Sequence, residues 1–256
     1  MNYKILNFIT LISILIILGW IHRWDLSWCY LWMPVVAWLL IVSLVSANIR
    51  WNFFIKSVHK GSRADRKIAL TFDDGPHPVY TLKVLEILKK YNAKATFFCI
   101  GKNIQNHPKI VQQIFKNGHS IGNHSFTHYK TIDFKSKSGW IKELKKTDSE
   151  IRKITGKKPR FFRPPFGVTT PHLADALRKS GHINIGWSQR TYDTILRDFH
   201  KINRKILKNA KPSDIILLHD HHENIVPLLE QLLPELARKN FTFTTVNELI
   251  DEEPYF

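Results

Sequence analysis

The sequence predicts an α/β fold, a parallel sheet with helices outside it, preceded by a two-helix transmembrane hairpin. Residues 5–47 contain two long apolar runs. From residue 66 onward, short runs rich in β-branched and aromatic residues alternate with segments whose apolar residues recur at helical spacing. Such alternation indicates a parallel sheet that is either open or closed into a barrel.

The two apolar runs are each long enough to cross a bilayer. The first extends from Ile5 to Ile21, and the second, from Trp28 to Ala47, contains no charged residue. About 20 residues span the hydrocarbon core, and aromatic residues near the ends of both runs are typical of membrane interfaces. We therefore expect a transmembrane hairpin over residues 1–50. A cleaved signal peptide is the alternative for the first run, which lacks a small-residue cleavage site.

The charges that flank the hairpin predict its orientation. The connecting loop carries only Arg23 and Asp25. The segment after the second run carries many cations: Arg50, Lys56, Lys60, Arg63, Arg66 and Lys67. Positive residues remain on the cytoplasmic side of most membrane proteins, so both ends of the hairpin are expected in the cytoplasm. The chain then divides into the hairpin, a basic juxtamembrane linker at residues 51–65 and a soluble domain at residues 66–256.

The high positive net charge of the chain favours anionic partners. The formal net charge is +17 at pH 7, which suits nucleic acid, acidic lipid headgroups or phosphate-bearing substrates. No recognisable nucleic-acid-binding motif accompanies the charge, so we expect no nucleic-acid partner. Cys29 lies in the second apolar run and Cys99 in a predicted strand, which indicates no disulfide framework.

The soluble domain is expected to alternate strands and helices. Runs rich in β-branched and aromatic residues predict its strands: residues 67–72, 94–101, 119–124, 160–165, 182–188, 214–220 and 241–247. Apolar residues at helical spacing predict a helix over residues 81–91. A second helix is expected over residues 139–156, which end on a glycine, a typical C-terminal stop. The polar run at residues 130–137 predicts a loop.

Ionisable residues stand at or just after the carboxyl ends of the predicted strands, where the chemistry of parallel α/β folds gathers. They occur in this order: Asp73 and Asp74, His124 and His128, Arg163, Asp193, and His219 with Asp220. Each has a structural interpretation as well, because Asp-Gly and Gly-Pro pairs usually mark turns and isolated histidines are common on surfaces. The four-residue spacing would place His124 and His128 on one face of a helical turn, where they could bind one metal ion.

The shared edge favours a chemical role for these residues. Two histidines and one carboxylate can bind a metal and leave positions open for water or substrate. A second carboxylate and a further histidine can then act as base and acid. This combination is what metal-assisted hydrolysis requires.

Five segments in order resemble the motifs of the polysaccharide deacetylases, the NodB-homology group also called carbohydrate esterase family four. They are TFDDGP (71–76), HSFTH (124–128), RPPFG (163–167), WSQRTYD (187–193) and LLHD (217–220). The resemblance covers about residues 66–250 and implies a distorted (β/α) barrel. It also implies a hydrolase that removes N-acetyl groups from N-acetylated amino sugars.

The resemblance implies a role for each motif. A divalent metal, usually zinc, would be held by Asp74, His124 and His128. Water activated by this metal would attack the amide carbonyl, with Asp73 as the general base. His219 would act as the general acid that protonates the leaving amine.

Other residues would support this chemistry. Arg163 would orient Asp73, and Asp193 would pair with His219. The backbone N–H of Phe166 would help to hold the oxyanion. Phe166 stands where the family usually has tyrosine, and this change leaves only the backbone role unaltered.

Several positions depart from the family pattern. Arg190 stands where an aspartate is common, and Thr194 replaces a tryptophan that usually walls the substrate groove. The groove, and with it the preferred sugar, is therefore expected to differ. His221 and His222 predict a solvated loop, with contact to a substrate phosphate as the alternative.

Two substrate classes remain open for an integral protein of the bacterial cytoplasmic (inner) membrane, whose hairpin contacts the lipid bilayer. A glycan polymer, such as peptidoglycan, fits the family, since many relatives act outside the cell. A polyprenyl-phosphate-linked sugar fits the cytoplasmic orientation and the basic linker. A catalytically silent glycan-binding protein of the same fold is the alternative function, and the complete set of Asp73, Asp74, His124, His128 and His219 argues against it.

Overall fold

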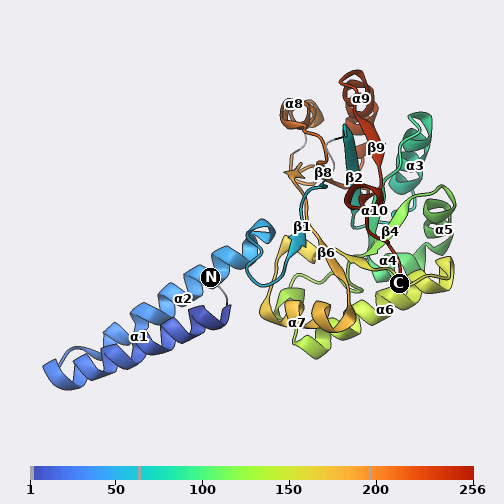
Figure 1. Cartoon of the computed structure of the whole chain (residues 1–256). Coiled ribbons are helices and arrows are strands. Elements are labelled where there is room, and N and C mark those ends of the chain that lie inside the picture. The colour runs from blue at the N-terminus through green and yellow to red at the C-terminus, as the bar shows by residue number, and fades with distance from the viewer. Residues whose placement is uncertain (1–2, 63–64, 197) are drawn as a thin grey trace.

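Two long helices project from one side of an α/β domain in the computed structural model, which describes residues 3–62, 65–196 and 198–256 (Figure 1). Helix α1 (Tyr3–Trp24) lies beside α2 (Trp32–Ala47), which follows a 3-10 turn, η1 (Trp28–Leu31). Both predicted apolar runs are therefore helical, and both are long and apolar enough to cross a membrane. Trp38 Nε1 donates a hydrogen bond of 2.8 Å to Asn7 Oδ1 and ties the two helices together.

The described residues form one parallel, nine-stranded sheet with the order β1-β6-β5-β4-β3-β2-β8-β7, and β9 pairs with the start of β2. The strands are β1 (Ser57–Val58), β2 (Lys67–Asp73), β3 (Thr96–Cys99), β4 (Ser120–Asn123), β5 (Phe161–Phe162), β6 (Ile183–Ile185), β7 (Gln189–Arg190), β8 (Ile215–His219) and β9 (Thr242–Thr244). No pairing joins β1 to β7 within the described residues, so the sheet is an open, distorted half-barrel. The predicted fold class is confirmed.

Every strand predicted from the sequence is present, but β1 and β7 were not predicted. Both are only two residues long, too short to carry a periodic pattern of their own. Strand β1 lies within residues 51–65, the segment expected to be a linker, and pairs with β6 through Ser57 and Val58. Part of that segment therefore belongs to the sheet, while residues 63–64 lie outside the described residues.

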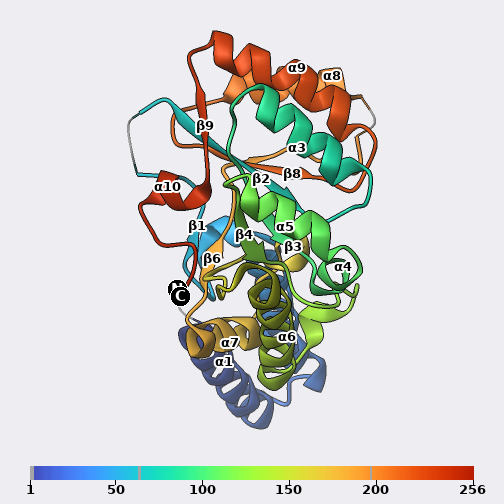
Figure 2. The ribbon, with the colours of Figure 1, turned by 90° about the vertical axis from the view of Figure 1, so that its right-hand side faces the viewer.

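Helices cover the outer face of the sheet (Figure 2). They are α3 (Tyr80–Lys90), α4 (Gly101–Asn106), α5 (Pro108–Lys116), α6 (Lys137–Thr155), α7 (Pro171–Ser180), α8 (Phe199–Asn209) and α9 (Ile225–Arg238). The short helix α10 (Val246–Ile250) packs Val246 and Leu249 in a second cluster, on the inner face of the sheet. Helix α6 begins after Ser136, whose hydroxyl accepts a hydrogen bond from Gly139 N, and ends at Gly156 with φ 73°. The loop predicted at residues 130–137 contains a 3-10 turn, η3 (Ile132–Phe134), in which Ile132 is buried.

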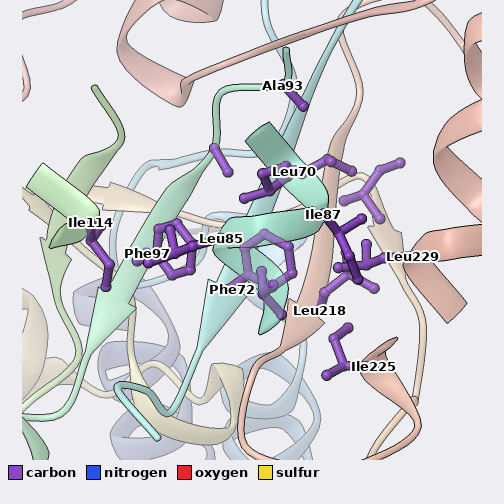
Figure 3. Packing of buried hydrophobic residues seen from close by; sticks show 14 of the residues in the cluster. Leu70, Phe72, Leu85, Ile87, Ala93, Phe97, Ile114, Leu218, Ile225 and Leu229 are labelled. Carbon is purple, nitrogen blue, oxygen red and sulfur yellow. The ribbon is translucent and has the colours of Figure 1, made fainter. Parts of the chain in front are cut away.

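The main core lies between the central strands and helices α3, α5 and α9 (Figure 3). Phe72 of β2 stacks on Phe97 of β3 with ring centroids 5.0 Å apart. Leu218 of β8 and Leu229 of α9 are fully buried beside them. Burying one such side chain contributes about 1.5–3 kcal/mol. The end of β2, which is the first segment of the candidate site, is therefore fixed by the best-packed part of the domain.

The end of the hairpin is packed against the domain. Thr169 N donates a hydrogen bond of 3.0 Å to Ser46 O, near the end of α2. The next turn, η2 (Ile49–Trp51), buries Ile49 in a cluster that contains Trp187. Arg50 Nε donates to the carbonyl oxygen of Trp187 at 3.2 Å. The hairpin therefore joins the domain at the carboxyl ends of β5 and β6.

Candidate metal centre and active site

The strand register brings the predicted site residues to one edge of the sheet. Asp73 is the register partner of His219 in β8, and Asn123, which precedes His124, is the partner of Phe162, which precedes Arg163. These residues surround a cavity of about 290 Å³. The cavity is lined by Asp73, Asp74, His124, His128, Phe166 and His219, among others. Arg163 and Asp193 stand behind Asp73 and His219.

Three side chains converge at the bottom of this cavity. Asp74 Oδ1 lies 3.4 Å from His124 Nε2 and 3.3 Å from His128 Nε2. One ligand atom from each residue lies within 4.8 Å of the other two. The arrangement could hold a single metal ion with two nitrogens and one carboxylate oxygen, a donor set that suits zinc and similar divalent metals.

The hydrogen bonds of these side chains fit a cation. His124 Nδ1 lies 2.8 Å from the carbonyl oxygen of Arg163, which can only accept, so Nδ1 carries the proton. In the neutral ring, Nε2 then presents a lone pair towards Asp74 Oδ1, which has no hydrogen-bond partner among the described residues. Two buried acceptors that face each other are repulsive without a positive charge between them. The residues therefore fit the metal that the family implies.

Electrostatics at the triad also favours a positive charge between these atoms. Burial alone would lower the pKa of His124, but the carboxylates of Asp73 and Asp74 outweigh it and raise that pKa. Burial alone would raise the pKa of Asp74, but the nearby His124, His128 and His219 outweigh it and hold that pKa well below its usual range. Burial and the neighbouring His124 lower the pKa of His128 to about 4, so its ring is neutral at pH 7. At pH 7 the cavity therefore contains an ionised carboxylate and an imidazole free to bind a metal.

The two histidines are positioned by a loop, and the helical turn expected from their spacing is wrong. His128 has φ 49°, which an α-helix does not allow. Glu143 of α6 holds the loop, because its Oε2 accepts hydrogen bonds from Phe126 N at 2.9 Å and Thr127 N at 2.8 Å. Sequence reasoning missed Glu143, since a glutamate on a charged helix carries no sign of a buried partner.

A buried arginine fixes the second carboxylate. Arg163 Nη1 donates to Asp73 Oδ1 at 2.7 Å and to Thr71 Oγ1 at 2.7 Å. Its other nitrogens donate to the carbonyl oxygens of Ile185 at 3.1 Å and Gly186 at 2.9 Å. The guanidinium is fully buried, so Asp73 keeps one geometry, with Oδ2 3.9 Å from His124 Nε2. Asp73 therefore lies beside the triad without belonging to it.

An imidazole and a carboxylate form a pair on the opposite wall. His219 Nδ1 lies 2.8 Å from Asp193 Oδ1, and His219 N donates to Asp193 Oδ2 at 2.8 Å. Burial alone would lower the pKa of His219, but the Asp193 carboxylate raises it to about 9. Thr191 Oγ1 also donates to Asp193 Oδ1, at 2.7 Å. His219 is therefore protonated at neutral pH and can donate a proton into the cavity.

Comparison with known proteins finds relatives that are similar to this chain in sequence. The sequence pattern described as polysaccharide deacetylase matches residues 60–185. A peptidoglycan-N-acetylglucosamine deacetylase of Bacillus cereus is 37% identical over 194 residues, which are 73% of this chain and 89% of the relative. The chain belongs to the polysaccharide deacetylase family. The predicted enzyme class, a polysaccharide deacetylase, is confirmed.

Solved structures of polysaccharide deacetylases share the fold. The crystal structure of the Bc1960 peptidoglycan N-acetylglucosamine deacetylase has a TM-score of 0.73 and 30% identity, and the match covers 77% of this chain and 94% of that chain. A pseudoenzyme of carbohydrate esterase family four from Bacillus anthracis has a TM-score of 0.71 and 25% identity, over 77% of this chain and 69% of that chain. The fold alone therefore does not decide whether a polysaccharide deacetylase domain is active.

Two histidines of this polysaccharide deacetylase domain differ from the sequence prediction. His221 and His222 were expected in a solvated loop, but His222 Nε2 lies 3.2 Å from Asp193 Oδ2 and His221 Nδ1 lies 3.5 Å from Asp74 Oδ2. Both are only partly exposed. The signal available in the sequence was their position directly after a strand that ends in an ionisable residue, because such loops fold back over the site.

The residues expected to depart from the family pattern, Phe166, Arg190 and Thr194, line the cavity. Phe166 has φ 58° and its ring lies 4.8 Å from that of His128. Tyr192 also lines the cavity. The groove is therefore bordered by an aromatic ring on one side and a cation on the other. The oxyanion role of Phe166 N stays a prediction.

Replacing Asp193 with asparagine is expected to lower the pKa of His219 from about 9 towards or below its ordinary value of about 6.5. Only the protonated ring can donate a proton, so the activity of the wild type should fall as the pH rises through the pKa of His219. In Asp193→Asn this fall should occur at lower pH. The alkaline limb of kcat/KM against pH should move down by about two units. Asp175→Asn, on the surface of α7, serves as the control. An alkaline limb that stays in place would exclude Asp193 as the residue that tunes His219.

Proposed function

We propose that this chain is a membrane-anchored, metal-dependent N-deacetylase that acts on N-acetylated amino sugars of a glycan or of a lipid-linked sugar. The observation that supports it best is the unpartnered Asp74 Oδ1 between two imidazole nitrogens. Asp73 and His219 stand beside this triad, each fixed by its own charged partner. The relatives with peptidoglycan deacetylase names support an N-acetylated amino sugar as the substrate.

The chain's own residues would divide the reaction between them. Asp74, His124 and His128 would hold a divalent metal, which would supply a Lewis acid for the amide carbonyl and the attacking water. Asp73, held by Arg163 through a 2.7 Å contact, would take the proton from the attacking water.

The second half of the reaction needs a proton donor. A C–N bond breaks readily only when the nitrogen is protonated, and His219 holds a proton at neutral pH because Asp193 raises its pKa to about 9. His219 would give this proton to the leaving amine of the sugar. Acetate and the free amino sugar are the products, with Phe166 N proposed as a donor to the oxyanion.

A silent glycan-binding domain is the competing function, because a pseudoenzyme shares the fold. The charge pairs of this site argue against it. Burying Arg163 against Asp73 and keeping Asp193 against His219 both cost desolvation energy. A site that only binds a neutral sugar has no need of a second carboxylate or of a protonated imidazole.

Release of acetate from N-acetylglucosamine oligomers tests the proposal directly. The full chain in detergent should release acetate, and a chelator should abolish this release. Added Zn²⁺ should restore the release, because a set of one aspartate and two histidine ligands binds zinc well. Release that continues in chelator at full rate would contradict the metal-dependent mechanism. Sugar binding without any acetate release would favour the silent alternative.

The two N-terminal helices support anchoring in a membrane. Large apolar side chains on their outer faces are exposed, including Phe8 at 63%, Leu44 at 61% and Leu40 at 60%. Such a surface is unfavourable in water and is typical of contact with lipid or another apolar partner. The positive-inside rule then favours a cytoplasmic location for the domain, at the inner membrane.

Topology mapping tests this orientation. Reporters fused at both termini should report a cytoplasmic location, and protease added to intact spheroplasts should leave the domain uncut. The reason is the concentration of cations after α2, which resists transfer across the membrane. Cleavage of the domain from outside would overturn the orientation and favour a glycan polymer over a lipid-linked sugar.

A further inference from the structure

A second cavity opens directly beside the catalytic cavity. Its volume is about 290 Å³, and it lies between η2, the segment that follows β6, and helix α8. Arg190 and Tyr192 line both cavities, so the two share one wall. None of the proposed catalytic or metal-binding residues lines the second cavity, and the reaction described above does not use it.

Three cations face this cavity: Arg50, Arg190 and Lys205. No carboxylate lines it, and none of the three cations has an ion pair with another described residue. Concentrated positive charge in a concave surface raises the local concentration of anions. The cavity therefore favours an anionic ligand.

The contacts of these cations leave their charges uncompensated but fix their positions. Arg50 donates to the carbonyl oxygens of Trp187 and Ser188. Arg190 and Lys205 lie against the ring of Tyr192, each 5.0 Å from its centroid. An arginine held in this way is suited to a phosphate, because it presents several N–H donors in a fixed plane.

The chemistry of an amino sugar links the two cavities. In an N-acetylated 2-amino sugar, the acetamido group is on carbon 2 and the group that joins the sugar to its carrier is on carbon 1. These carbons are neighbours. If the acetamido carbonyl lies at the metal site, the substituent on carbon 1 must therefore occupy space next to the catalytic cavity.

The hairpin, which is the proposed membrane anchor, joins the domain on the side where this substituent would leave. Arg50 follows the second apolar helix by three residues, and Ser46 in that helix accepts a hydrogen bond from Thr169 of the catalytic rim. Figure 1 shows the hairpin extending away from the domain from this point. A lipid chain attached to a phosphate in the second cavity would have a short path along α2 into the bilayer.

We propose that the cavity formed by Arg50, Arg190 and Lys205 binds the phosphate of a lipid-linked amino sugar. The inference rests on the proposed deacetylase function and narrows its substrate to a lipid-phosphate-linked sugar. The hairpin then contributes to substrate recognition through Arg50 as well as to anchoring.

Binding of geranyl phosphate to the full chain in nonionic detergent tests the site without turnover. Calorimetry should show binding to the wild type, weakened about tenfold or more by Arg190→Gln and by Lys205→Gln, because each removes a charge-assisted contact. Lys208→Gln is the matched control, since this lysine is exposed on the same helix and does not line the cavity. Equal affinity of wild type and both variants would overturn the proposal. Inorganic phosphate bound as tightly as geranyl phosphate would overturn the lipid assignment.

A kinetic comparison tests the substrate class. The ratio of kcat/KM for a short-chain lipid-diphosphate-linked N-acetylglucosamine to that for a neutral N-acetylglucosamine oligomer should fall about tenfold in Lys205→Gln. An unchanged ratio would count against the phosphate site. Failure of the deacetylase function itself would be recognised separately, since no substrate would release acetate while the binding measurement still reports on the cavity.

Discussion

Replacing His128 with alanine is expected to remove the metal and the activity together. One of the two imidazoles that face Asp74 Oδ1 is lost, and the remaining donors hold a divalent ion poorly. Without the metal, neither the amide carbonyl nor the attacking water is activated, so the loss should exceed the about 10⁴-fold that removal of a general base can cost. Metal content by atomic spectroscopy and acetate release check the two effects separately.

The fold should survive this substitution. His128 lies at the rim of the sheet, partly exposed, outside the main core. Its loop remains held by Glu143, which bonds to the backbone of residues 126 and 127. His172→Ala, on the exposed face of α7, is the matched control and should keep both metal and activity. A His128→Ala protein with full metal content would show that this residue is not a ligand.

Much of the fold followed from local pattern. Strands β2, β3 and β8 are fully or almost fully buried on both faces, so their runs of apolar residues stand out from the charged helices around them. The site followed as well, because parallel strands bring their carboxyl ends together whatever lies between them in the sequence. The order of ionisable residues after those strands therefore indicated five side chains that line the cavity: Asp73, Asp74, His124, His128 and His219. Three other residues of that series, Arg163, Asp193 and Asp220, do not line it, and their roles stay predictions.

The parts that could not be predicted depend on contacts between distant segments. Strand β1 forms because Ser57 and Val58 meet the edge of β6, more than a hundred residues later. Glu143 and His222 acquire their roles only through partners at residues 126–127 and Asp193. In the sequence, Arg50 is one of several cations that follow the second apolar run. Only the contact between η2 and Trp187 places its side chain at the second cavity. None of these contacts leaves a periodic signal in the sequence.

Replacing Asp73 with asparagine is expected to keep the metal and lose turnover. The amide is close in size to the carboxylate, and its oxygen can still accept the hydrogen bond that Arg163 Nη1 donates to Asp73 Oδ1 at 2.7 Å in the wild type. Unlike the carboxylate, the amide takes no proton from water at neutral pH. We expect kcat to fall by about 10²–10⁴, the usual contribution of a general base. KM should change little, because the triad and the other residues that line the cavity are untouched.

Asp73 and Asp74 are adjacent in the chain, which makes the pair of asparagine variants a sharp test of their different roles. Asp74 Oδ1 faces His124 and His128, whereas Asp73 Oδ1 is occupied by Arg163. Asp74→Asn should therefore lose metal as well as activity, and Asp73→Asn should lose activity alone. Near-normal kcat in Asp73→Asn would refute its role as the base, and metal loss equal to that of Asp74→Asn would assign it to the metal instead. Asp175→Asn, at the surface of α7, should match the wild type in both measurements.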